Sequence, residues 1–154
     1  HEGEVSTILH DEISEGDMIN LSAPVGGFSI ENTERPQLFI GSGVGMTPLV
    51  SMFKKAASLN VPTQMIQAVV TEDERPFDSI TDNYEQAQLH LHVKDKEGYL
   101  EAKELEQYLS EQPEIYICGG TKFLHSIINS LKELNYDMNH VHFETFIPRL
   151  SVQV

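Results

Sequence analysis

From residue 37 onward, short apolar runs alternate with longer segments whose apolar residues recur at helical spacing. The apolar runs lie at residues 38–40, 64–70, 89–93, 115–118 and 141–146. A regular alternation of strands and helices is typical of a parallel sheet with helices on both faces. We therefore expect an α/β fold with a doubly wound, Rossmann-like sheet of five parallel strands.

Two helices are indicated by apolar residues at positions i, i+3, i+4 and i+7. One follows the first strand and one follows the fourth, and their apolar stripes are Leu49, Met52, Phe53, Ala56 and Leu124, Ile127, Ile128, Leu131. Asn60 and Pro62 are expected to end the first helix, and Asn135 can end the second in a left-handed conformation. Two weaker helices are expected at residues 79–88 and 101–111.

The beginning of the chain follows a different pattern. We expect Ser6 to cap a short helix that runs through about Glu12, and a strand at residues 18–23, where apolar and polar side chains alternate. The composition changes in the polar linker that follows. We therefore divide the chain into residues 1–33 and 34–154.

The composition excludes several classes of function. The chain has 154 residues, and its 24 acidic against 10 basic side chains give a formal net charge of −14, which repels nucleic acid and anionic lipid. Its single cysteine, Cys118, excludes an internal disulfide and an iron–sulfur cluster held by this chain alone. No apolar run reaches the roughly 20 residues that span a bilayer, and no leader opens the sequence, so we expect a cytoplasmic protein. The chain does not begin with methionine, and we expect it to be cut from a longer protein.

The loop between the first strand and the first helix reads Gly41-Ser42-Gly43-Val44-Gly45-Met46-Thr47-Pro48. Unpaired N–H groups and the helix dipole at a helix start favour an anion, and glycines let the backbone approach a phosphate closely. We expect Thr47 to cap the helix or bind a phosphate oxygen, and Pro48 to occupy the first helical position. The loop predicts a pyrophosphate site, although its Gly-x-Gly-x-Gly spacing departs from the usual dinucleotide fingerprint and a purely structural tight turn is the alternative. A bulky residue at Gly45 should then weaken nicotinamide binding and leave the fold intact.

A second glycine turn ends the fourth strand, in the stretch Ile115-Tyr116-Ile117-Cys118-Gly119-Gly120-Thr121. In a doubly wound sheet the first and fourth strands are neighbours where the strand order reverses, so both glycine turns are expected to open on one crevice. Nothing near Cys118 in sequence marks it as an activated thiolate. We therefore expect it to pack against a cofactor rather than to act as a nucleophile.

Two further patterns carry little information by themselves. The last strand delivers a carboxylate next to an aromatic ring in Glu144-Thr145-Phe146-Ile147-Pro148, but strand glutamates are usually solvated and phenylalanines usually lie in the core. The pairs His90-x-His92 and His140-x-His142 each place two imidazoles on one face of a strand. Because no third ligand lies nearby in sequence, we interpret them as ordinary strand histidines and expect no metal site.

Taken in order, the two glycine turns and the closing Glu-x-Phe resemble the ferredoxin-NADP reductase superfamily. Within it, the segments most similar to bacterial flavohaemoglobins are Gly3-Glu4-Val5-Ser6, Pro24-Val25-Gly26-Gly27-Phe28, Gly43 to Pro48 and residues 142–148. The resemblance covers nearly the whole chain. It implies that residues 34–154 are the NAD(P)H-binding domain of such a reductase, and that residues 1–33 are the tail of a flavin-binding β-barrel.

The resemblance also implies where the cofactors bind. Gly41 and the loop from Gly43 through Val44, Gly45, Met46 and Thr47 to Pro48 would hold the NAD(P)H pyrophosphate, and Cys118, Gly119 and Gly120 would lie beside the nicotinamide. The FAD pyrophosphate would bind at the start of the first helix, at Gly3, Val5, Ser6 and Thr7. The flavin ring would face Thr145, Phe146, Ile147 and Pro148, with Phe146 against the isoalloxazine. Glu144 would tune the redox potential and, with Cys118, is a candidate for a catalytic role.

The chain departs from the family in two places. Gly120 stands where proline is common, and the Arg-x-Tyr-Ser flavin motif is absent, so we expect that this chain alone does not hold FAD. After the second strand, the acidic stretch Thr71-Glu72-Asp73-Glu74-Arg75 disfavours a 2′-phosphate and therefore favours NADH over NADPH, with Arg75 acting in the opposite sense.

Three functions follow as hypotheses. In the first, NADH passes a hydride to FAD, and single electrons then reach a haem in an upstream globin domain, which converts nitric oxide and dioxygen to nitrate. In the second, the same reductase delivers electrons to a ferredoxin, an iron–sulfur domain or a small acceptor. In the third, the chain is a nucleotide-binding module without turnover.

Overall fold

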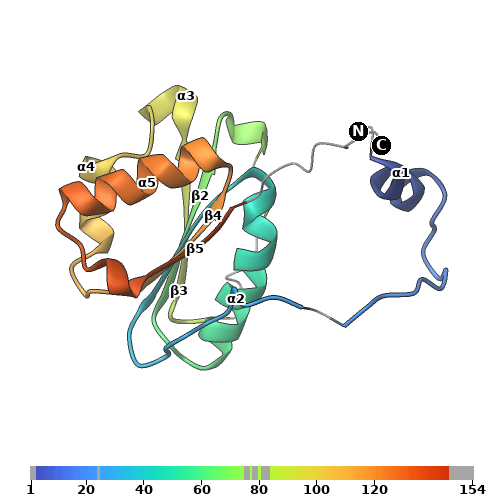
Figure 1. Cartoon of the computed structure of the whole chain (residues 1–154), viewed down its shortest axis with the longest axis horizontal. Helices are drawn as coiled ribbons and strands as arrows, with labels where there is room; N and C mark the ends of the chain where they lie inside the picture. The colour runs from blue at the N-terminus through green and yellow to red at the C-terminus, as the bar shows by residue number, and fades with distance from the viewer. Residues whose placement is uncertain (1–2, 24, 75–76, 78–79, 81–83, 146–154) are drawn as a thin grey trace, which may run out of the picture.

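The computed structural model describes residues 3–23, 25–74, 77, 80 and 84–145. Its centre is a sheet of five parallel strands in the order β3-β2-β1-β4-β5 (Figure 1). The strands are β1 (Gln37–Ser42), β2 (Thr63–Val69), β3 (Ala87–Val93), β4 (Glu114–Gly119) and β5 (Val141–Thr145). The chain builds outward from β1 to β3 and then returns to add β4 and β5 on the other side of β1. The doubly wound sheet is therefore confirmed, and β1 and β4 are neighbours as expected.

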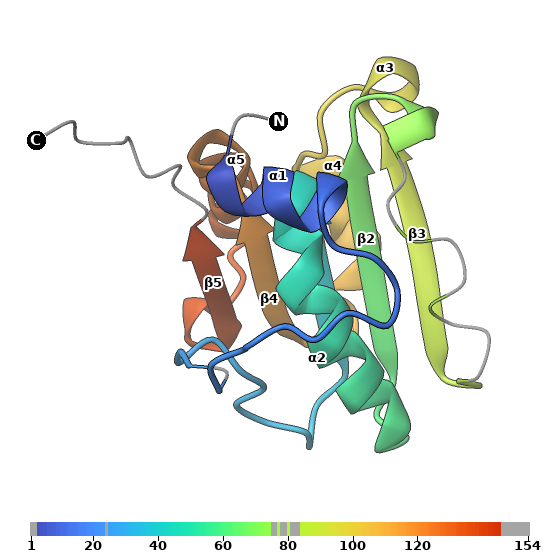
Figure 2. The same ribbon diagram turned by 90° about the vertical axis from the view of Figure 1, so that its right-hand side faces the viewer.

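Helices cover both faces of this sheet because each long helix carries an apolar stripe. The helix α2 (Met46–Ser58) packs on one face against a buried cluster that includes Phe39, Met65 and Tyr116. The helix α5 (Thr121–Glu133) and the short α4 (Ala102–Leu105) cover the opposite face. Figure 2 shows α2 in front of the strands and α4 and α5 behind them.

The two long helices end at the residues expected from the sequence, but one of the two weaker predicted helices is not found. Asn60 and Asn135 adopt positive φ angles of 56° and 54° just beyond α2 and α5, as expected for left-handed stops. The helix expected at 101–111 exists, but it shortens to α4 and a 3-10 turn at Glu106–Tyr108. The described residues of 79–88 are not helical, because parallel pairing with β2 extends β3 back to Ala87.

The beginning of the chain is a helix and a long irregular segment. The helix α1 (Glu4–Asp11) has no buried residue, and Figure 1 shows it well to the side of the sheet. The strand expected at residues 18–23 is not formed, and Met18 and Leu21 are 98% and 82% exposed. A strand needs a hydrogen-bonded neighbour, and this segment has none among the residues described. The apolar side chains of this segment therefore have no surface to pack on within the described part of the chain.

Candidate functional site: two glycine turns and a cationic pocket

The two glycine turns pack directly against each other at the carboxyl ends of β1 and β4. A Cβ atom added to Gly45 would lie 2.6 Å from the backbone nitrogen of Gly119 and closer still to the carbonyl of Cys118. A Cβ atom at Gly119 would in turn lie 2.6 Å from the hydroxyl of Ser42. Both turns therefore depend on glycine, and they meet at one place, as the sequence predicts. The expectation that a bulky residue at Gly45 leaves the fold intact is wrong, because that residue would push on the backbone of β4.

The helix α2 begins two residues earlier than expected, directly after the first glycine turn. A 3-10 turn at Gly43–Gly45 runs straight into α2, so Gly45 is the cap and Met46 the first helical residue. Thr47 is therefore not the cap: its hydroxyl donates a 2.8 Å hydrogen bond to the carbonyl of Val44. Pro48 occupies the third helical position instead of the first, where its missing N–H still costs nothing.

The remaining loop residues face different directions. Met46, the first residue of α2, is buried in the core, and Gly41 lies inside β1. Val44 is exposed, and Gly43 is exposed with a φ of 52°, in open space. The part of the loop that a ligand can reach is therefore its tip.

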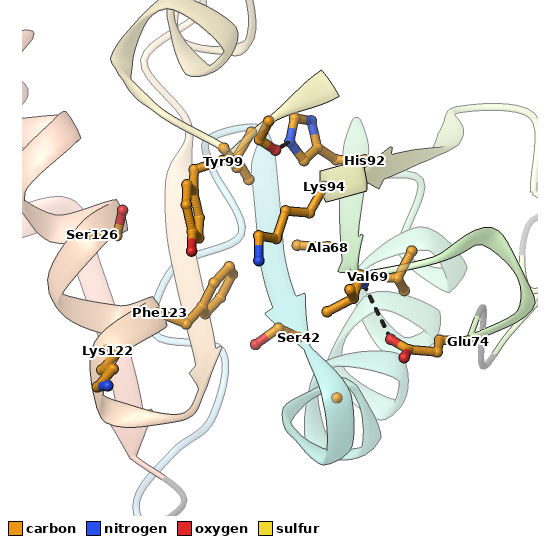
Figure 3. A pocket seen from close by; sticks show the side chains of 14 residues that line it. Ser42, Ala68, Val69, Glu74, His92, Lys94, Tyr99, Lys122, Phe123 and Ser126 are labelled. Carbon is orange, nitrogen blue, oxygen red and sulfur yellow. Dashed lines mark hydrogen bonds between the residues drawn. The ribbon is translucent and has the colours of Figure 1, made fainter. Parts of the chain in front are cut away.

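A pocket of about 590 Å³ opens beside the tip of this loop, at the carboxyl ends of β1, β2 and β3. Figure 3 shows its lining side chains: Lys94 at the start of α3 (Lys94–Glu97), Tyr99 in the loop that follows, and Lys122 and Phe123 in the first turn of α5. The ammonium of Lys94 lies 4.7 Å from the centre of the Tyr99 ring and points into the pocket.

This pocket is locally cationic although the chain carries a net charge of −14. The ammonium groups of Lys94 and Lys122 and the amino end of α5, a helix of 13 residues, all favour an anion there. Sequence reasoning missed both lysines. Lys94 directly follows β3, and Lys122 comes three residues after the end of β4, so the rule that identified the glycine turns could have identified both lysines as well.

The acidic stretch after β2 is only partly directed at the pocket. Glu74 lines the pocket and accepts a 3.1 Å hydrogen bond from the backbone N–H of Val70 (Figure 3). Glu72 instead forms an ion pair with Lys96, and Arg75 lies outside the described residues. One carboxylate of the stretch therefore reaches the pocket.

Cys118 and Glu144 lie opposite each other on adjacent strands, with Gly41 opposite Cys118 on the other side. Cys118 is fully buried against the α2 face of the sheet. Burial and the charge of Glu144 raise the pKa of its thiol to about 11, so the neutral form dominates at neutral pH. A neutral, buried thiol packs well and attacks poorly, which agrees with packing rather than nucleophilic catalysis.

The other expected cofactor residues divide into two groups. Gly120 caps α5 with φ −69° and ψ 156° and has open space around it, while Thr145 ends β5. Phe146, Ile147 and Pro148 lie outside the described residues.

At the beginning of the chain, the residues expected to bind the FAD pyrophosphate are all exposed. The expectation that Ser6 caps α1 is wrong, because Gly3 is the cap and the carbonyl of Gly3 accepts from the N–H of Thr7. Val5 is 69% exposed. The side chains of this segment are thus open to a partner surface.

The histidine pairs have partners inside the protein. His90 bonds to Gln64, and His92 donates to the carbonyl of Gly98. His140 and His142 both bond to Glu114. Among the residues that the structure describes, no group of three histidine, cysteine, aspartate or glutamate side chains could hold a metal ion. No helix within the described part of the chain is both long and apolar enough to cross a membrane.

No protein-family model matches the chain. Among curated proteins, a flavohemoprotein of Bacillus cereus is 31% identical over 99% of this chain, and one of Bacillus subtilis is 30% identical over 98%. The chain spans only 43% of the length of either relative. Among solved structures, the flavohem-like FAD/NAD-binding domain of nitric oxide dioxygenase from Vibrio cholerae is 26% identical, with a TM-score of 0.81 over 95% of this chain and 65% of its own. A flavohemoglobin from Malassezia yamatoensis shares the fold, with a TM-score of 0.74 at 19% identity over 95% of this chain and 41% of its own.

Proposed function

From homologues that are flavohemoproteins, and from a sheet with the fold of their FAD/NAD-binding reductase domain, we propose that this chain is the pyridine-nucleotide-binding part of a flavin-dependent electron-transfer enzyme. The observation that carries the proposal is the contact between the two glycine turns beside a cationic pocket. A dinucleotide needs an anion site and a flat hydrophobic site within reach of each other, and this end of the sheet offers both.

The residues of the pocket bind and orient the nucleotide. Lys94 and Lys122 attract its pyrophosphate, and the exposed tip of the first glycine turn lets the backbone approach it. Tyr99 and Phe123 offer rings for its apolar parts. The redox chemistry belongs to the cofactors, since a nicotinamide donates hydride and a flavin can accept it and release single electrons.

The nicotinamide end of the nucleotide would lie toward β4. There Gly120 is exposed with open space beside it and offers a side-chain-poor surface on which a ring can lie flat, with the buried Gly119 and the neutral, buried Cys118 next to it in the chain. Glu144 stands next to Cys118 across the sheet and would contribute negative charge near the flavin, together with Thr145 to Pro148. The protein positions the two rings and excludes water between them.

We assign the FAD pyrophosphate to the segment from Gly3 to Thr7, and we assign residues 1–33 to the tail of a flavin-binding barrel. Their exposed apolar side chains fit this role, because a barrel supplied by preceding sequence would cover them. In this proposal the chain alone does not turn over. The complete protein works in the cytoplasm, passes electrons to a haem in an upstream globin domain and supports nitric oxide dioxygenation.

For the nucleotide we propose NADH. Glu74 holds its carboxylate at the edge of the pocket, where it would repel the extra phosphate of NADPH, while Lys94 attracts the pyrophosphate that both nucleotides share. Glu74→Gln should therefore improve catalysis with NADPH more than with NADH. An unchanged ratio of the two kcat/KM values would contradict this assignment.

The complete protein tests the main proposal. Under anaerobic conditions, NADH should bleach the absorbance of the bound flavin, and haem reduction should follow. A protein that binds flavin but is not bleached by NADH or NADPH would exclude a reductase. Flavin bleaching without a reducible haem would instead favour an iron–sulfur or small-molecule acceptor.

A further inference from the structure

A polar cluster around one buried carboxylate lies at the opposite end of the strands from the nucleotide pocket. Its members are Glu114, which begins β4, with Arg35, His140 and His142, and we call them the Glu114 cluster. The side chain of Glu114 is only 3% exposed. One of its oxygens accepts a 2.7 Å hydrogen bond from Nδ1 of His140, and the other accepts a 2.9 Å bond from Nε2 of His142.

Arg35 fixes the protonation state of His140. The guanidinium donates to the carbonyl of Gln112, and its NH1 lies 2.8 Å from Nε2 of His140. A guanidinium can only donate, so Nε2 of His140 must accept. The ring proton of His140 is therefore on Nδ1, where it is donated to Glu114, and His140 is neutral in this arrangement.

The linker that joins the beginning of the chain to the sheet is held by Arg35 of this cluster and by Tyr116, which lies beside His142. Within this linker, the N–H of Glu31 donates a 2.9 Å hydrogen bond to the hydroxyl of Tyr116, and the ring of Phe28 lies edge-on to Tyr116 at 6.2 Å. Tyr116 in turn stacks on His142, with 4.8 Å between the ring centres. Arg35 is the last of these contacts before β1 begins.

We propose that the Glu114 cluster is a proton-operated latch that fixes the linker, residues 28–36, to the sheet, and that His140 is its switching group. A second proton on His140 turns Nε2 from an acceptor into a donor that faces the guanidinium of Arg35. The hydrogen bond between them is then lost, and the carboxylate of Asp137, 3.8 Å from Nε2, becomes the nearest alternative partner. The latch therefore opens when His140 takes up a proton.

The neighbouring groups make His140 the specific switch. The titratable and charged groups that face it are Arg35 from the linker, Glu114 from β4, Asp137 from the preceding loop, and Tyr136 and His142 nearby. Burial raises the pKa of Tyr136 to about 12, so it stays neutral throughout. Protonation of His142 breaks no bond of the cluster, because its Nε2 donates to Glu114 in both states.

The consequence for catalysis rests on the proposed function. If residues 1–33 belong to the flavin-binding barrel, the linker determines how the flavin is positioned relative to the nicotinamide. The nucleotide pocket lies at the far end of the strands and does not depend on the linker. Opening the latch should therefore lower kcat for flavin reduction and leave KM for NADH unchanged. His140 and Arg35 are positioning residues in this scheme.

Hydrogen–deuterium exchange of the complete protein between pH 5 and 8 tests the latch. In the wild type, the protection of residues 28–36, corrected for intrinsic exchange, should fall by about tenfold toward acid, the size expected for losing a charge-assisted hydrogen bond. In His140→Gln the protection should not depend on pH, because an amide can donate to Glu114 and accept from Arg35 but cannot titrate. His142→Gln is the matched control and should keep the pH dependence of the wild type.

Two results would overturn the latch: linker protection in the wild type that does not change with pH, or a pH dependence that survives in His140→Gln. The exchange measurement needs no turnover, so it tests the latch even if the protein proves unable to reduce flavin. Where flavin reduction occurs, a kcat that stays constant while the linker opens would overturn the catalytic consequence.

Discussion

At the scale of single residues, we attribute the proposed anion affinity of the pocket to two lysines on different elements. Lys94 follows β3 and Lys122 lies in the first turn of α5. Substitution of either by alanine should weaken NADH binding by about tenfold, since each removes one charge-assisted contact to a phosphate. Fluorescence titration of NADH into the complete, flavin-loaded protein measures this effect.

Lys132 provides the control for these lysine variants. It lies on the same helix as Lys122 but lines a different groove, together with residues of β5. Lys132→Ala should bind NADH like the wild type. If it lost as much affinity as the two pocket variants, the effect would be one of general charge rather than of a site.

Cys118 should be chemically silent in the native protein. Its thiol is buried and its pKa is raised to about 11, mainly by burial, so little thiolate exists near pH 8. A thiol-labelling reagent should therefore react only as fast as the protein opens, and urea should accelerate labelling strongly. Rapid labelling of the folded protein at a rate typical of a free cysteine would contradict this environment.

Glu114 should control part of the acid stability. Burial alone would raise the pKa of its carboxyl, but hydrogen bonds from His142 and His140 outweigh burial and lower the pKa below the ordinary value of 4.5. A lowered pKa means that the carboxylate stabilises the fold fully above about pH 4.5, and that this contribution is lost as the pH falls through the folded-state pKa. Glu114→Gln should thus be less stable by about 1–3 kcal/mol at pH 7.

The difference between wild type and Glu114→Gln should shrink toward pH 3, because protonation removes the same charge from the wild type. Urea unfolding at pH 7, 4 and 3 measures it. If the free energy of unfolding fell equally for both proteins over this range, carboxylates other than Glu114 would determine the stability at acid pH.

At the scale of helices and strands, the sequence predicted the features that depend on residues close together in the chain. The five strands and the two long helices were expected from apolar spacing, and Asn60 and Asn135 end the helices as expected. The start of α2 was misplaced, because the 3-10 turn at Gly43–Gly45 continues into the helix without a side-chain cap. A continuous run of turns leaves no capping signature in the sequence.

The predictions that depend on residues far apart in the chain failed for a different reason. The strand expected at residues 18–23 has the right alternation, but forming it requires a neighbour that this chain does not provide among its described residues. Each lysine could have been noticed near the end of a strand, but the order of the strands is what brings Lys94 and Lys122, 28 positions apart, to line the same pocket. The site thus depends on topology, whereas each glycine turn can be recognised alone.

The contact between the two turns makes a prediction about glycine. In Gly45→Ala the new methyl group would meet the backbone of Cys118 and Gly119, so β4 must shift, at a cost of about 3 kcal/mol or more. In Gly43→Ala the methyl group has open space and the cost comes only from the positive φ, about 1 kcal/mol. Denaturant unfolding should rank the two variants in this order, and the reverse order would mean that the turns do not touch.

At the scale of the whole molecule, the chain consists of a well-packed sheet domain and a beginning with little burial of its own. The helix α1 contributes no buried residue, and Met18, Leu21 and Val25 are largely exposed. By contrast, Phe28 and Glu31 contact Tyr116 in β4, and Arg35 contacts Gln112 and His140 in the turns that precede β4 and β5. The physical boundary therefore lies before Phe28, a few residues earlier than the change in composition at residue 33.

Two shortened chains place this boundary by experiment. A chain of residues 27–154 keeps every linker contact described above, and the described residues that it loses are all exposed, so its Tm should lie within about 2 °C of the Tm of the full chain. A chain of residues 37–154 loses the cover of Tyr116 and the guanidinium beside Glu114. Its Tm should fall by about 10 °C or more, because seven hydrogen bonds and a buried ring contact are removed. Thermal unfolding followed by circular dichroism distinguishes the two. If the shorter chain were as stable as the longer one, the linker contacts would contribute nothing to the sheet domain, and the Glu114 cluster could not hold the linker against it.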